Sequence, residues 1–90
     1  MIENFDATVG GQVQQFCASL GEGPRPHRVI ISSADTAKTL VIFDVSGLLG
    51  ALKAEIEEPE KLIADAISKA QEDGLLEVAL RTGEIQEAAL

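Results

Sequence analysis

The chain has few of the residues that supply special chemistry or covalent stabilisation in small proteins. Its 90 residues include one cysteine, Cys17, one histidine, His27, three phenylalanines, and no tryptophan or tyrosine. A single cysteine excludes an intramolecular disulfide, and a lone histidine without cysteine partners does not make a metal site. We therefore expect no metal and no cofactor. The core must be mainly aliphatic and must pack through many weak dispersion contacts.

Long apolar runs are also missing. No segment approaches the length of about 20 apolar residues that a membrane-spanning helix needs. The first residues, Met-Ile-Glu-Asn-Phe-Asp, are acidic and lack the apolar stretch of a secretory signal. The length allows one domain, residues 1–90. We expect a cytoplasmic protein.

Basic residues are scarce as well. The chain contains seven Lys and Arg residues and fifteen Asp and Glu residues, which gives a formal net charge of −8. Such a surface repels phosphate backbones and acidic headgroups, so nucleic-acid and membrane partners are not expected. A basic protein partner remains compatible with this charge, which also favours solubility by itself.

Two apolar segments stand at the centre of the sequence, Val29–Ile31 and Leu40–Val45. They predict two strands, at about 27–33 and 39–45, joined by a loop of four or five residues. Neither segment alternates between apolar and polar residues, which is typical of a sheet covered on both faces. A chain of this length has helices enough for one face. We therefore expect a second copy to cover the other, in a homo-oligomer and most simply a homodimer.

Three further segments predict helices. A helical stripe in residues 6–20 comprises Val9, Val13, Phe16, Cys17 and Leu20, although Gly10 and Gly11 weaken its first turns. Helices are also predicted for 47–57, with Ser46 as its cap, and for 59–73, with Pro59 in its first turn. Residues 75–81 alternate as a strand does, while a short helix remains open. Residues 84–90 are expected to be a terminal helix or a tail.

The predicted fold class is α+β. It is a small antiparallel sheet of two or three strands, centred on a β-hairpin and packed with helices. The expected order is helix, strand, strand, helix, helix and then the doubtful strand at 75–81.

The basic residues Arg25, His27 and Arg28 form the first candidate site. Two guanidinium groups entering a strand are able to bind an anion or an acidic partner. The alternative is a solvated loop whose arginines pair weakly with surplus carboxylates.

A second candidate site lies at Ser46 and Gly47, after the second central strand and before a predicted helix. The N–H groups at a helix N-terminus attract anions, although Ser46 is equally explained as a helix cap. Residues 41–52, Val-Ile-Phe-Asp-Val-Ser-Gly-Leu-Leu-Gly-Ala-Leu, are similar to the strand-turn-helix of anti-sigma-factor antagonist (STAS) domains. The resemblance implies that Ser46 is a phosphorylatable regulatory serine.

Four hypotheses for function follow. The first is a small, acidic, non-catalytic protein-interaction module that forms a homodimer through the sheet or through the apolar side of the 47–57 helix. The second is a regulatory domain for a small anionic ligand at the candidate residues above, and the third is a STAS-like antagonist. The fourth is an enzyme with Cys17 as nucleophile and His27 as base, against which Cys17 is better explained as a buried, inert thiol.

Overall fold

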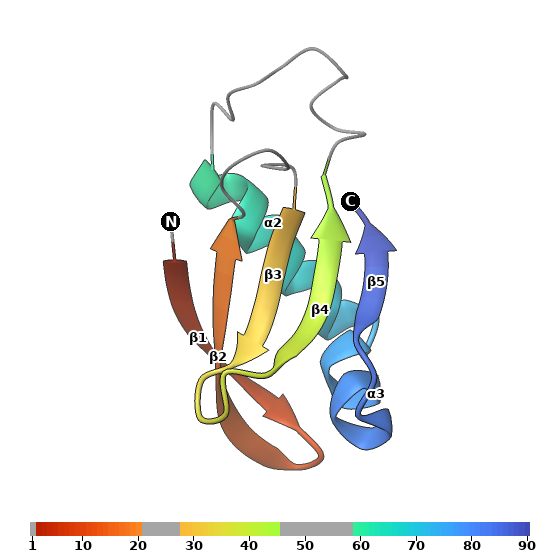
Figure 1. Ribbon diagram of the computed structural model, residues 1–90. Coiled ribbons are helices and arrows are strands. Elements are labelled where there is room, and N and C mark those ends of the chain that lie inside the picture. The colour runs from red at the N-terminus through yellow and green to blue at the C-terminus, as the bar shows by residue number, and fades with distance from the viewer. Residues whose placement is uncertain (1, 21–27, 46–58) are drawn as a thin grey trace.

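The computed structural model describes residues 2–20, 28–45 and 59–90. The elements are β1 (Ile2–Val9), β2 (Gln12–Leu20), β3 (Arg28–Ser33), β4 (Thr39–Asp44), α2 (Pro59–Glu72), α3 (Leu75–Thr82) and β5 (Gln86–Ala89). All five strands form one sheet in chain order. The first four pair antiparallel, and β5 pairs parallel to β4. The helix α2 crosses the sheet on one side, behind the strands in Figure 1. The predicted two- or three-stranded sheet with a leading helix is therefore wrong.

The predicted helix over residues 6–20 is instead the hairpin of β1 and β2. Gly10 and Gly11 form its two-residue loop, with φ angles of 60° and 79°. Both glycines thus take the left-handed conformation that such a turn requires, and that other residues avoid. The strand divides the residues of that helical stripe between its two faces. Phe16 is fully buried on the covered face, whereas Val13 is 71% exposed and Cys17 lies on the opposite face. The Gly-Gly pair marks a turn between two strands, not a weak helix start.

The central pair of strands is confirmed as β3 and β4, with a five-residue loop at 34–38. The hydroxyl oxygens of Ser33 and Thr36 accept hydrogen bonds from the backbone N–H groups of Thr36 and Lys38, at 3.5 and 3.4 Å. These hydroxyl contacts hold the turn in which Asp35 lies.

A β-bulge interrupts the pairing of these strands. The register shifts between Ile31 and Ser32, and opposite this point both Leu40 and Val41 are buried. A bulge sets two residues of one strand against one of the other, so neighbouring side chains point to the same face. Part of the unbroken apolar run therefore reflects the bulge and does not require a cover on both faces.

The helix predicted at 59–73 is confirmed as α2, and the strand preferred for 75–81 is wrong. That segment is α3, in which Leu76 and Ala79 are buried three residues apart on one helical face. Gly74 and Gly83, both left-handed, bracket it. The predicted terminal helix or tail is also wrong, because Gln86–Ala89 form β5. The helix predicted at 47–57 lies outside the described residues.

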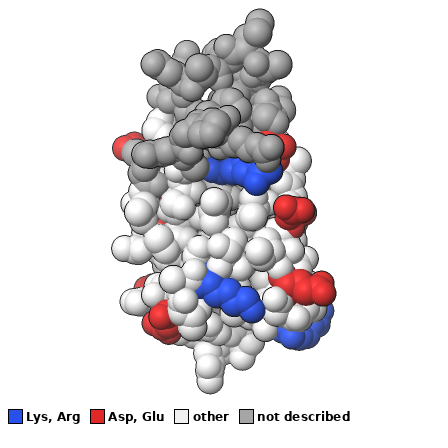
Figure 2. All heavy atoms as spheres, viewed as in Figure 1, with Lys and Arg blue, Asp and Glu red and all other residues white. Residues whose placement is uncertain are grey.

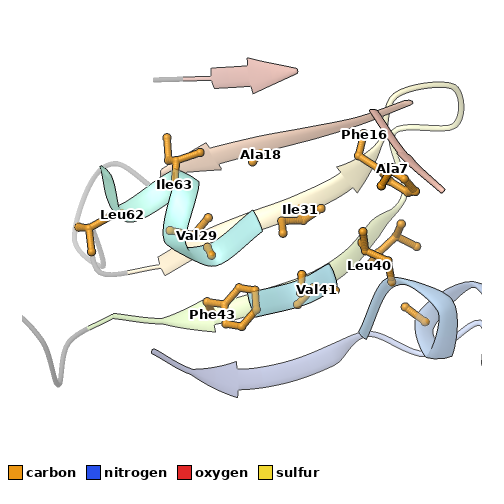
Figure 3. Close-up of a cluster of buried hydrophobic side chains, with 14 of the residues drawn as sticks. Ala7, Phe16, Ala18, Val29, Ile31, Leu40, Val41, Phe43, Leu62 and Ile63 are labelled. Carbon is orange, nitrogen blue, oxygen red and sulfur yellow. The ribbon is translucent and has the colours of Figure 1, made fainter. Parts of the chain in front are cut away.

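The core lies between the sheet and the two helices (Figure 3). The sheet and the loop ends give buried Ala7, Phe16, Ala18, Val29, Ile31, Leu40, Val41, Phe43 and Val45, and the helices give Leu62, Ile63, Ala66, Ala70, Leu76 and Ala79. The buried residues alternate along the strands, at Phe16 and Ala18 in β2 and at Val29 and Ile31 in β3, so a single face of these strands meets the helices.

We expect the effect of replacing a glycine of the β1–β2 turn to depend on how readily the new residue adopts positive φ. A Cβ added at either would meet nothing within 4 Å, so any cost comes from the backbone alone. Gly11→Val should lower the free energy of unfolding by about 1–2 kcal/mol, because a β-branched residue resists positive φ. Gly10→Asn should remain close to the wild type, since Asn is favoured at the first position of this turn. Urea denaturation measures both, and equal destabilisation by the two variants would contradict the turn assignment.

Candidate functional site: the open face of the sheet

The face of the sheet opposite the helices is the candidate site, and we call it the open face. The strand register places side chains there in two neighbouring rows that cross the strands. One row is Ile2, Ser19, Ile30, Ile42 and Glu87, and the other is Asn4, Cys17, Ser32 and Thr39. Because alternate residues of a strand point to opposite faces, none of these belongs to the helix-covered core.

Most of this surface is uncharged and partly apolar. Ile30 and Ile42 are half-buried on the two central strands, and Ile2 on the edge strand is 69% exposed. Cys17 and Ser19 between them are half-buried too. Figure 2 looks onto this face and shows a band of uncharged side chains across its middle, with basic groups above and below the band and acidic groups toward the sides. In a chain with fifteen acidic residues, such a band is a distinct surface.

A charged cluster marks one end of the open face. Arg28 on β3 lies directly across from Asp44 on β4 in the strand register. Both line a shallow hollow of about 330 Å³ together with Ile42, Glu87 and Ala88. Two carboxylates next to one guanidinium give this hollow no net attraction for an anion. The placement of Arg28 therefore weighs against an anion site there, while Arg25 and His27 lie outside the described residues.

The second candidate site is only partly described. Residues 41–44 form the end of β4, in keeping with the strand that the STAS resemblance implies. Ser46 and Gly47 lie outside the described residues. The first four strands pair in antiparallel succession, which differs from the β-α-β alternation of that family.

Cys17 lies on strand β2 of the open face and not on a helix. Its cross-strand neighbours are Asn4 and Ser32, neither of which is a general base. The thiol is half-buried, in contrast to the expected full burial. Within the part of the chain that the structure describes, no three His, Cys, Asp or Glu residues are grouped to hold a metal ion.

The residues that distinguish this face were not singled out by the sequence. Ser19 lies in the segment that was predicted as a helix, and Ile30 and Ile42 were assigned to strands covered on both faces. A signal was present in the Gly-Gly pair, which is typical of a hairpin turn when strand-like segments flank it.

Comparison with known proteins gives no relative: no family model, no curated protein and no solved structure matches this chain. Among residues 2–20, 28–45 and 59–90, no helix combines the length and the hydropathy that crossing a bilayer requires.

The assignment of faces predicts different effects at neighbouring isoleucines of β3. Ile31 is fully buried against the helices and Ile30 is half-buried on the open face. Ile31→Ala should lower the free energy of unfolding by about 3 kcal/mol, through lost burial and a cavity. Ile30→Ala should cost about 1 kcal/mol at low protein concentration, since less apolar surface is withdrawn from water. Chemical denaturation gives both values, and equal losses would mean that both faces are covered within one chain.

Proposed function

We propose that this chain is a non-catalytic protein-interaction module that forms a homodimer through the open face of its sheet. The observation that supports this most is the uncharged band of the open face, centred on Ile30 and Ile42 and opposite the helix-covered core. Apolar surface on a sheet gains stability when a second layer removes it from water.

A second copy fits this face on electrostatic grounds. Each chain carries a net charge of −8, so two copies repel each other over most of their surfaces. They approach closely at lowest cost where carboxylates are sparse, which is the middle of the open face. Apart from Glu87 at the β5 end, its rows hold isoleucine with serine, cysteine, asparagine and threonine, so the contact leaves few charges to desolvate.

An interface of ordinary size is small compared with the accessible surface of the chain. A stable interface buries about 800 Å² on each partner. The chain exposes 5667 Å² in total, so the interface takes a modest share of it. Two open faces packed about 10 Å apart allow their isoleucine side chains to interdigitate.

The other hypotheses have less support. An anionic ligand at Arg28 competes with Asp44 and Glu87, which line the same hollow. Cys17 has amide and hydroxyl neighbours where a nucleophile needs a base. A protein-interaction role requires neither an anion site at Arg28 nor a reactive thiol at Cys17.

The dimer should depend on Ile30. The Ile30→Lys substitution places one ammonium group from each copy inside the apolar interface. An unpaired buried charge costs about 3 kcal/mol or more. We expect light scattering after size exclusion to show a dimer for the wild type and a monomer for the variant at the same concentration. The variant should stay folded by circular dichroism, because the helix-covered core is unchanged.

Leu80→Lys is the matched control. Leu80 is 38% exposed and lies on α3, one of the helices that cover the opposite face of the sheet. It places the same charge on an aliphatic residue of the same size, so the dimer should persist. A wild type that stays monomeric at millimolar concentration, or a dimer lost equally in both variants, would contradict the proposed interface.

Cys17 reports on the same contact without a mutation. Its thiol lies within the proposed interface, so a second copy should shield it from a water-soluble thiol reagent. We expect the labelling rate to fall as the protein concentration rises through the dimer dissociation constant. The Ile30→Lys monomer should be labelled at a rate independent of concentration. A concentration-independent rate in a wild type that is shown to be dimeric would place the interface elsewhere.

A further inference from the structure

The strand β1 is an edge of the sheet that lacks most of the usual protection against an added strand. In the described part of the chain it pairs with β2 alone, over all eight of its residues. It contains no proline, no lysine and no register shift, the features that commonly block an edge. The opposite edge, β5, is only four residues long.

The geometry of the hairpin fixes which backbone groups of β1 face outward. In a two-residue hairpin, Val9 and Gln12 flank the loop and form the hydrogen-bonded pair. Antiparallel pairing then alternates along the strand. The N–H and C=O groups of Ile2, Asn4, Asp6 and Thr8 therefore point away from β2, toward the position of a further strand.

The surroundings of this edge are acidic. No Lys, Arg or His occurs from Ile2 to Leu20, while Glu3 and Asp6 place one carboxylate on each face of β1. Three shallow hollows of about 560–630 Å³ adjoin the strand, and Asp6 lines all of them. Among the described residues, the other charged groups that line them are Asp35 and Glu77, both acidic.

We propose that β1 binds an extended, basic segment of another protein as an additional strand of the sheet. The outward N–H and C=O groups of the edge supply backbone hydrogen bonds, which is how extended peptides join exposed sheet edges elsewhere. The side chains of the bound segment alternate between the two faces of the sheet. Lys or Arg at every second position lies next to Asp6 on the open face, and the residues between them lie on the same face as Glu3. The hollows beside the strand give these long side chains room.

A second copy of the chain fits this edge less well. When two β1 strands pair antiparallel over their full length, Asp6 of one lies close to Asp6 of the other on the same face. Such diagonal neighbours are about 7–8 Å apart, and like charges at this distance oppose pairing. Glu3 and Asp6 therefore act against self-association and favour a basic partner. The partner strand pairs with the backbone edge of β1, whereas the homodimer packs on the side chains around Ile30 and Ile42, so the two proposals are tested separately.

A synthetic ten-residue peptide with Lys at alternate positions, and Val or Thr between them, tests the proposal. Fluorescence anisotropy should show it binding the intact chain, more weakly as salt is raised. The same peptide with Glu for Lys should not bind. Hydrogen exchange should slow at the amides of Asn4, Asp6 and Thr8 when the Lys peptide is added, because these N–H groups gain partners.

Two matched pairs of variants locate the contact. Asn4→Pro removes one outward N–H, which an edge strand tolerates, and should weaken binding about three- to tenfold relative to Asn4→Ala. Asp6→Asn should weaken binding about two- to fivefold, whereas Asp65→Asn on α2 makes the same change of net charge and should not.

Absence of binding at millimolar peptide would overturn the proposal. Glu3 and Asp6 would then serve only to oppose edge-to-edge aggregation. Equal affinity of Asn4→Pro and Asn4→Ala, or protection at β5 in place of β1, would overturn it as well. The Ile30→Lys monomer should still bind the Lys peptide, which separates failure of the edge from failure of the homodimer.

Discussion

The structure depends on burying one face of a five-stranded sheet beneath two helices. The largest fully buried side chains, Phe16, Phe43 and Ile31, all lie in strands and on that covered side. The helices complete this layer with small and aliphatic residues such as Ile63 and Ala66. Because successive side chains of a strand point to opposite faces, the remaining strand side chains lie on the other face, where within the described chain no helix packs. The open face is thus a consequence of how the core is made.

The elements that sequence reasoning identified correctly are those whose signal is local. The strands β3 and β4 contain concentrated β-branched residues, and α2 begins at a proline and carries a clear helical stripe. The hairpin of β1 and β2 was missed because five apolar residues in 6–20 fit helical spacing, although the strands place them on both faces of the sheet. In α3, eight residues are too few for the period to decide between helix and strand, and packing on the sheet decides it. The strand β5 has only four residues, and it forms because β4 offers it an edge.

The sequence predicted a second apolar face on the sheet, but it did not identify the residues that form this face. The run from Val29 to Ile31 correctly suggested that apolar residues occupy both sides of the central strands, and Ile30 does lie opposite the core. The basic and serine residues that attracted attention fall outside the described chain, except Arg28, which lies at the end of the open face. Assigning Cys17 and Ile2 to that face requires the strand register, which depends on a turn that the sequence pattern alone left ambiguous.

The distribution of charge links the two surfaces. A net charge of −8 spread evenly would oppose every contact between acidic copies and would attract basic segments everywhere. In this chain the charge is sparse across Ile30 and Ile42, and it is wholly negative along β1. The first arrangement favours a neutral contact between like copies, because little charge must be desolvated. The second disfavours like copies and favours a partner of opposite sign. Under the two proposals, the local density of charge on one sheet thus separates a like copy from a basic partner.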